Sequence, residues 1–153
     1  MSTHESAAPH RLLPSLSGLY DQLAPLSYPL MRFCIGAMLV PHGYAKLFQT
    51  GVGNLTGIID KMGLQPATGW AYWIAILEFF GGIMLALGLL TRPVALLVAV
   101  EMAVAALGIH WGNGFFWTNK GYEYPLLWGL LCLAIAFRGG DKLSLDGVIG
   151  KEI

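Results

Sequence analysis

Five ionisable residues stand inside long apolar stretches of this sequence. They are Arg32, His42, Lys46, Glu78 and Glu101. An ionised side chain at a lipid-facing helix centre costs at least about 2.5 kcal/mol, so such residues face protein or water if the stretches cross a membrane. They are therefore candidates for ligand binding or proton transfer, with ion pairs that only fix helix packing as the competing interpretation.

Most of these side chains are predicted to lie towards one end of the helices. At about 1.5 Å of rise per residue, His42 and Glu78 come out slightly external of the bilayer midplane. Lys46 lies one turn further out on the same helix face as His42, because residues four apart are neighbours. His110 and Glu123 come out at the level of Lys46. The sequence therefore predicts a polar cluster near the external surface.

An aromatic roof is expected over this external cluster. It consists of Trp111, Phe115, Phe116, Trp117 and Tyr122. Pro41 removes a backbone hydrogen bond beside the cluster and is expected to kink its helix, which makes room for a ligand or adjusts packing. No catalytic residue is assigned. The candidate ligand-binding residues are His42, Lys46, Glu78, His110, Trp117, Tyr122 and Glu123.

Arg32 and Glu101 form a second set, nearer the cytoplasmic half. Their estimated depths differ by several ångströms, a gap that a long arginine side chain can close. For this pair we favour a structural ion pair over chemistry.

No residue spacing favours a metal site or a covalently bound cofactor. His42 and His110 could be joined by a glutamate, but lone histidines near membrane interfaces are more often hydrogen-bonded structure than ligands. Cys34 and Cys132 sit in apolar runs and lack the Cys-x-x-Cys spacing of redox or metal motifs. We expect no metal, and two small buried cysteines.

Membrane-spanning helices are the elements that must position these side chains. Of 153 residues, 56% are hydrophobic and 12% are charged, against roughly 25% charged in a soluble domain. Crossing about 30 Å of hydrocarbon takes roughly 20 apolar residues. Four stretches fit, the last of them short: 27–48, 70–90, 93–109 and 124–137. The sequence thus predicts an all-α membrane protein, a four-transmembrane-helix bundle.

The regions outside these spans have their own pattern. Apolar residues at helical spacing predict short interfacial helices within 12–23 and within 55–62. We divide the chain into a polar N-terminus with its interfacial helix (1–26), a four-helix transmembrane domain (27–137) and a cytoplasmic C-terminal tail (138–153).

Basic residues outside the spans set the expected orientation. Arg11, Arg92, Arg138, Lys142 and Lys151 fall on one side, and Lys61 and Lys120 on the other. Both termini are therefore expected in the cytoplasm, and the polar N-terminus does not read as a cleavable signal. Zero net charge and scattered basic residues exclude a nucleic-acid partner.

Several short runs that combine charged, aromatic and glycine residues are spread along the chain. They are Arg32-x3-Gly36, His42-Gly43-x2-Lys46-Leu47-Phe48, Glu78-Phe79-Phe80-Gly81-Gly82, Gly88-Leu89-Leu90-Thr91-Arg92, Glu101-Met102, Asn113-Gly114-Phe115-Phe116-Trp117, Gly121-Tyr122-Glu123-Tyr124 and the Gly139-Gly140-Asp141-Lys142 run. This set resembles the DoxX-like family of small four-helix membrane proteins. The resemblance implies a redox-linked setting, because relatives include membrane subunits of thiosulfate:quinone oxidoreductase. It does not transfer catalytic residues.

Two functions stay open at this point. In the first, the chain is a membrane subunit of a quinone-linked oxidoreductase system. A pocket near the external face holds a quinone or similar apolar ligand, the electron-transfer cofactor belongs to a partner, and His42, Lys46 and Glu78 serve the quinone oxygens. In the second, it is a non-catalytic anchor or accessory subunit that docks a larger membrane complex. A small transporter is less favoured, because no internal repeat is evident.

Both open functions share the same expected surroundings. The partners are the lipid bilayer and another membrane or membrane-associated protein, and the location is a bacterial inner (plasma) membrane. Whether the chain has enzymatic activity of its own is left open by the sequence.

Overall fold

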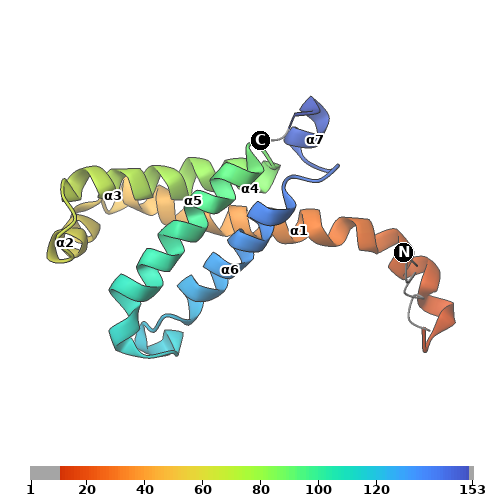
Figure 1. Ribbon diagram of the computed structural model, residues 1–153, viewed down its shortest axis with the longest axis horizontal. Coiled ribbons are helices and arrows are strands. Elements are labelled where there is room, and N and C mark those ends of the chain that lie inside the picture. Colours follow the sequence, from red (N-terminus) through yellow and green to blue (C-terminus); the bar gives the residue numbers. More distant parts are fainter. Residues whose placement is uncertain (1–10, 152–153) are drawn as a thin grey trace, which may run out of the picture.

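The first membrane helix is far longer than its apolar stretch. The computed structural model describes residues 11–151, which are helical with short connections and contain no strand (Figure 1). A short 3-10 turn, η1 (Pro14–Leu16), leads into α1 (Ser17–Tyr44), which continues without a break as the π-helical turn η2 (Ala45–Gln49). The helix therefore begins ten residues before the membrane stretch that the sequence predicts, which starts at residue 27.

The prediction of a separate interfacial helix within 12–23 is wrong, because most of that segment is the start of α1. Pro25 and Pro29 lie inside the helix and do not end it. A proline lacks one backbone donor, but its fixed φ is already close to the helical value, so the chain can continue as a helix through it.

The remaining helices follow in quick succession. They are α2 (Gly53–Lys61), α3 (Ala67–Ile76), η3 (Leu77–Gly81), α4 (Gly82–Leu87), α5 (Thr91–Val104), η4 (Ala105–His110), η5 (Trp111–Asn113), η6 (Trp117–Asn119), α6 (Glu123–Arg138) and α7 (Leu145–Ile149). The π-helical turn η3 joins α3 and α4 into one rod, and η4 extends α5 in the same way. The helix predicted in the first connection is confirmed as α2.

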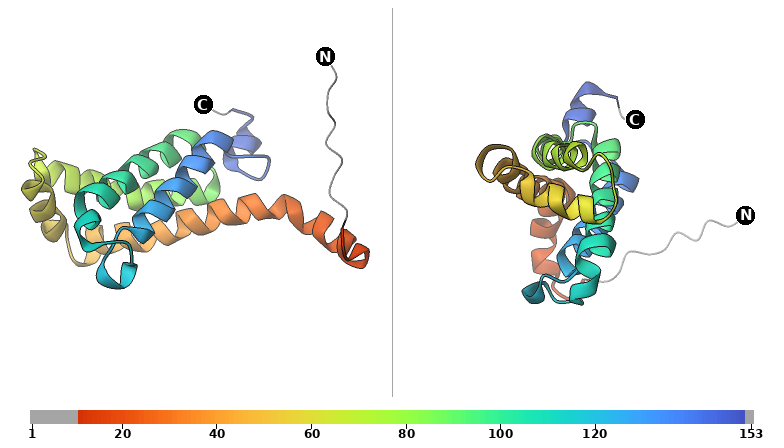
Figure 2. Two further views of the ribbon diagram at one scale, coloured as in Figure 1. Left: turned by 60° about the horizontal axis from the view of Figure 1, so that its bottom comes forward. Right: turned by 90° about the vertical axis from the view of Figure 1, so that its left-hand side faces the viewer.

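Two pairs of helices build the bundle. α1 lies along the rod formed by α3, η3 and α4, and α5 forms a hairpin with α6. The hairpin runs obliquely across the first pair, and it diverges from the end that carries α2 (Figures 1 and 2). The two pairs meet through α5, which also packs on η3 and α4.

Small residues let α1 approach its neighbour backbone to backbone. A Cβ atom at Gly36 would overlap the backbone of Gly82 and Ala86 on α4, and one at Gly43 would overlap Phe79 on η3. Close approach of this kind is the usual source of helix association in lipid, where apolar burial between helices gains little. These two glycines fix the distance between the first helix and the rod.

The tight turn between α4 and α5 is fastened by α7. Gly88 and Leu90 adopt left-handed φ values of 72° and 47°. The carboxylate of Asp146 accepts hydrogen bonds from the backbone N–H of Leu90 (2.8 Å) and of Thr91 (2.9 Å) and from the Thr91 hydroxyl (2.7 Å). The backbone N–H of Asp146 donates to the Gly88 carbonyl at 2.9 Å. Three backbone groups of the turn that lack partners within a helix, the N–H groups of Leu90 and Thr91 and the Gly88 carbonyl, are thus hydrogen-bonded to α7.

The segment before α7 is held by α1. The buried guanidinium of Arg32 donates to the carbonyls of Gly140 and, at 2.7 Å, of Leu143. The Tyr28 hydroxyl donates to the carbonyl of Gly139, and the Arg138 guanidinium lies 4.1 Å from the centre of the Tyr28 ring. We call these hydrogen bonds the C-terminal clamp: those that Tyr28 and Arg32 donate to residues 139–143, and those that the Asp146 carboxylate accepts from Leu90 and Thr91. It ties residues 139–146 to both α1 and the α4–α5 turn.

Three stretches of the described chain are long and apolar enough to cross a membrane. They run over Pro14–Gln49, Ala67–Leu87 and Thr91–Asn113. The molecule is thus built as an integral membrane protein. α6 has 16 residues and covers the predicted fourth span. Its length, about 24 Å at the usual rise, is less than the roughly 30 Å of hydrocarbon in a bilayer.

Candidate functional site

A partly buried ion pair joins the first helix to the rod. The Lys46 ammonium on η2 donates a hydrogen bond to Oε2 of Glu78 on η3. The lysine side chain is 25% exposed and the glutamate side chain 8%, so the pair is reachable only from the lysine side. Two of the residues predicted to bind a ligand are thereby brought together.

Local backbone geometry explains why these two side chains meet. Gly43, three residues before Lys46, packs directly on the backbone of Phe79, the residue after Glu78. The absence of a side chain at Gly43 therefore brings η2 within reach of η3. Both ionisable residues also lie in π-helical turns, which occur mostly as short insertions within α-helices and often at functional sites.

Glu101 of α5 completes the site. Its carboxyl group lies close enough to Glu78 and Lys46 to interact electrostatically with both. Its Oε2 atom is buried and has no hydrogen-bond partner. Glu101 also interacts electrostatically with the buried thiol of Cys132 on α6. We call Lys46, Glu78 and Glu101 the interior cluster.

The predicted ion pair between Arg32 and Glu101 is not formed. Arg32 lies in the C-terminal clamp, where its nearest opposite charges are those of Asp141 and Asp146. Glu101 faces Glu78 and Lys46 instead. The depth estimate failed because it placed the last segment outside the bundle, whereas that segment returns and supplies the carbonyls that Arg32 binds.

The other predicted ligand-binding residues lie in or near the connection between α5 and α6. Nδ1 of His110 is 2.6 Å from the Lys120 carbonyl, and Oε2 of Glu123 accepts a hydrogen bond from the Trp117 backbone at 3.1 Å. Tyr122 stacks on the neighbouring Trp111 ring, with centroids 4.7 Å apart.

These contacts keep the connection folded on itself. Within residues 11–151, no hydrogen bond or ion pair links His110, Glu123 or Tyr122 to the interior cluster. His42 is exposed on α1, one turn before Lys46. The predicted external cluster is thus divided into an ion pair inside the bundle and a separate polar connection.

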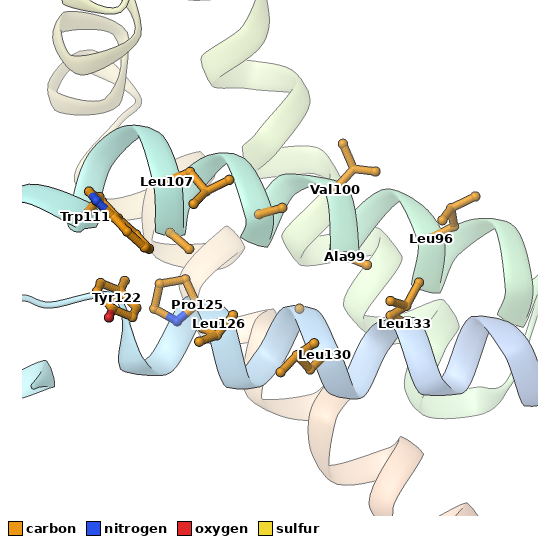
Figure 3. Close-up of a pocket in the computed structure, with 13 residues that line it drawn as sticks. Leu96, Ala99, Val100, Leu107, Trp111, Tyr122, Pro125, Leu126, Leu130 and Leu133 are labelled. Atoms are coloured by element: carbon orange, nitrogen blue, oxygen red, sulfur yellow. The ribbon is translucent and has the colours of Figure 1, made fainter. Parts of the chain in front are cut away.

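An apolar groove of about 330 Å³ runs between α5 and α6. Trp111 and Tyr122 lie at one end of it, and Leu96 and Leu133 lie at the other (Figure 3). Small residues such as Ala99 form part of its wall. None of the three residues of the interior cluster lines this groove, which opens on the other face of α5.

The partners of Glu101 and the burial of one tryptophan are not predicted from the sequence. Glu101 belongs to the interior cluster. The small residues that flank it on α5 are the sequence signal that could have indicated a close helix contact at its position. The indole Nε1 of Trp128, on α6, is buried without a partner, and nothing in the sequence separates it from the interfacial aromatics. No group of three or more His, Cys, Asp or Glu side chains in the described part could hold a metal ion.

Comparison with known proteins gives the chain its family. The family model described as DoxX matches residues 28–111. This chain belongs to the DoxX family. The matched range includes all three residues of the interior cluster and Arg32, but it ends before α6 and the last segment of the C-terminal clamp.

Two proteins of similar sequence align with most of the chain. An uncharacterized protein of Haemophilus influenzae is 33% identical over 135 residues, which are 86% of this chain and 97% of the relative. A Bacillus subtilis protein named "Putative oxidoreductase CatD" is 31% identical over 122 residues, 80% of this chain and 86% of that protein. No solved structure shows a significant match.

Proposed function

We propose that this protein is a membrane subunit of a quinone-linked oxidoreductase system and that its interior cluster binds the oxygen of a quinone or a similar apolar ligand. The observation that carries the proposal is the convergence of Lys46, Glu78 and Glu101 from three helices inside a membrane domain. Ionisable groups are placed there at a cost, and function is the default reason to keep them. The oxidoreductase name of the Bacillus subtilis relative supports a redox setting.

The chemistry of the cluster suits quinone reduction. A quinone becomes a quinol by taking up two electrons and two protons, and each oxygen changes from a hydrogen-bond acceptor to a donor. Lys46 can donate to the quinone oxygen, and a carboxylate of Glu78 or Glu101 can accept from the quinol hydroxyl. The electrons come from a cofactor of a partner protein. The role of this chain is to orient the ring and exchange protons with it.

Access to the cluster is from the side of the first helix. The Lys46 side chain is one-quarter exposed, and His42 is exposed one turn away on α1. Pro41 precedes His42 inside the helix. A ligand that approaches along this side meets the ammonium group of Lys46 before either carboxyl group.

We also propose that α6 is the fourth span and that both termini are cytoplasmic, in an inner membrane. A topology reporter fused at residue 1 or at residue 153 is then expected to read cytoplasmic, and one inserted between Gly112 and Lys120 is expected to read external. The measurement is paired phosphatase and fluorescent-protein activity in cells. Termini on opposite sides would leave three spans and contradict this arrangement.

Substitution of Glu78 by Gln tests the quinone proposal. The change keeps the shape of the side chain and removes its charge, so retained quinone should fall about tenfold or more, as expected when one strong charged hydrogen bond is lost. The protein is purified in nanodiscs with an added short-chain quinone, and the bound quinone is extracted and quantified. Asp60→Asn, on the exposed face of α2, is the control and should retain quinone normally.

Two results would count against quinone binding. One is wild-type protein that retains no more quinone than empty nanodiscs. The other is a folded Glu78→Gln protein that retains as much as wild type. Circular dichroism and elution volume establish that each variant is folded.

A second function, a non-catalytic anchor or accessory subunit, is favoured by the groove between α5 and α6. Its wall includes the small residues Ala99, Ala103 and Ala106, which allow a further helix to approach closely. This function predicts that Ala103→Trp releases a co-purifying membrane complex, whereas Glu78→Gln does not. Quinone retention unaffected by either change would favour it over the first.

A further inference from the structure

We propose that two copies of this chain associate through a stripe of apolar side chains on the first helix. The stripe runs from the end of η1 along α1 and consists of Leu16, Leu19, Leu23, Leu26, Leu30 and Phe33. We call it the leucine stripe. It includes no residue of the interior cluster and none of the groove between α5 and α6, so the proposal is independent of the function proposed above.

The spacing of the leucine stripe is that of a coiled-coil seam. Its members are separated alternately by three and by four residues, which is a repeat of about 3.5 residues. This repeat keeps one narrow line of side chains facing a partner helix, and each side chain inserts between four residues of that helix. A surface that faces only acyl chains has no need of it. The spacing therefore indicates another helix as the occupant.

The leucine stripe lies on the side of α1 that the bundle leaves uncovered. Its six side chains are between 37% and 61% exposed. At about 3.6 residues per turn, the buried residues Arg32, Ile35 and Leu39 lie roughly on the opposite side of the helix. A second molecule can therefore reach the stripe without displacing any contact within the bundle.

The first part of the leucine stripe lies beyond the predicted membrane stretch. The continuous helix covers 36 residues, Pro14–Gln49, which is on the order of 50 Å, whereas the hydrocarbon layer is about 30 Å thick. Figure 2 shows the N-terminal end of α1 projecting past the other helices. Leu16, Leu19 and Leu23 precede residue 27, where the predicted stretch begins. A row of exposed leucines outside the hydrocarbon indicates an interaction surface.

Insertion in a membrane favours a second copy of the chain as the partner. Copies inserted with the same orientation have parallel first helices, and their leucine stripes lie at the same height. A two-fold axis along the membrane normal then places each leucine against its own counterpart, which is the arrangement of a parallel coiled coil.

The charges on α1 do not oppose this association. Asp21 is the only charged residue of α1 before Arg32, and its carboxylate accepts a hydrogen bond from Arg11 at 3.1 Å. By helical periodicity Asp21 lies on the side opposite to the leucine stripe. No like charges therefore meet across the seam. Gln22 and Ser27 lie beside the stripe and keep the apolar seam narrow, which suits a single partner helix.

Disulfide cross-linking in membranes tests the proposal. Cys34 is first replaced by Ala, while Cys132 is buried and stays in place. Identical residues at the seam of a parallel dimer lie roughly 6 Å apart between Cα atoms, a distance that a disulfide spans. We expect Leu23→Cys and Leu26→Cys to give severalfold more cross-linked dimer on oxidation than Ala24→Cys, an exposed control between them. Equal cross-linking at the three positions, or none at any, would overturn the proposal.

Photobleaching of singly labelled chains in lipid vesicles counts the copies directly. Wild-type protein should bleach in two steps, and the double variant Leu19→Gln, Leu23→Gln should bleach in one. Both leucines are exposed in the single chain, so the bundle is left intact. Ala24→Gln is the control and should keep two steps. One-step bleaching of wild type, or two-step bleaching of the double variant, would contradict the proposal. Quinone retention should be the same in all three proteins, which separates a failure of association from a failure of quinone binding.

Discussion

Substitution of Gly36 by Leu is expected to prevent α1 from packing on α4. The Cβ atom alone would overlap the backbone of Gly82 and Ala86, and backbone cannot move aside as a flexible side chain can. Overpacking usually costs about 1–3 kcal/mol, and a clash with backbone at a helix crossing belongs at or above the top of that range. We expect the folded yield of the purified protein to fall by tenfold or more.

The matched control lies on the same helix. Gly18 also belongs to α1, and a side chain there meets nothing within 4 Å. Gly18→Leu should fold and unfold like wild type in a titration with sodium dodecyl sulfate in mixed micelles, followed by tryptophan fluorescence. Normal stability of Gly36→Leu would mean that α1 and α4 do not touch at this point.

Asp146→Ala is expected to give the second large loss of stability. Asp146 is 5% exposed, and its carboxylate holds two backbone N–H groups and one hydroxyl at the α4–α5 turn. Removing it leaves these donors without their acceptor, at a cost of about 3 kcal/mol or more. The same detergent titration measures the loss. Asp60→Ala, which removes an exposed carboxylate, should cost much less.

The pH dependence of stability distinguishes Asp146 from a residue that only fills space. Burial alone would raise the pKa of Asp146, but hydrogen bonds from Thr91 and Leu90 and the charge of Arg32 outweigh it and hold the pKa below its ordinary value. A lowered folded-state pKa adds stability above the ordinary value, about 3.9, and that stability is lost as the pH falls through the folded pKa. Wild-type protein should lose this increment in acid, whereas Asp146→Ala, which lacks it at every pH, should not.

The membrane character and most of the helices follow directly from composition and apolar length. The apolar runs predict the α3–α4 rod and α5, because a stretch of that length has few alternatives in a bilayer. The start of α1 does not follow in this way. Its first turns are exposed and are followed by Pro25, so neither apolar length nor helix propensity predicts that they continue into the membrane helix.

Only part of the candidate site can be predicted from the sequence. Depth along a helix places Lys46 and Glu78 near each other, because both belong to spans whose direction is known. Depth says nothing about rotation around each helix, and the π-helical turns η2, η3 and η4 alter that rotation. Glu101 was therefore matched to Arg32 when it faces Glu78. The partners of Arg32 are backbone carbonyls, which carry no sequence signal at all.

The C-terminal clamp has a consequence for biosynthesis. Its contacts join Arg32 to residues 140 and 143, and Leu90 and Thr91 to Asp146. The later partner of every contact leaves the ribosome only after α1, the α3–α4 rod, α5 and α6 have been synthesised. The helices are thus inserted first, and the C-terminal clamp that holds them together forms last. A chain cut short before Gly139 would reach the membrane with all its spans but without the clamp, in a form that quality-control proteases can recognise as unfinished.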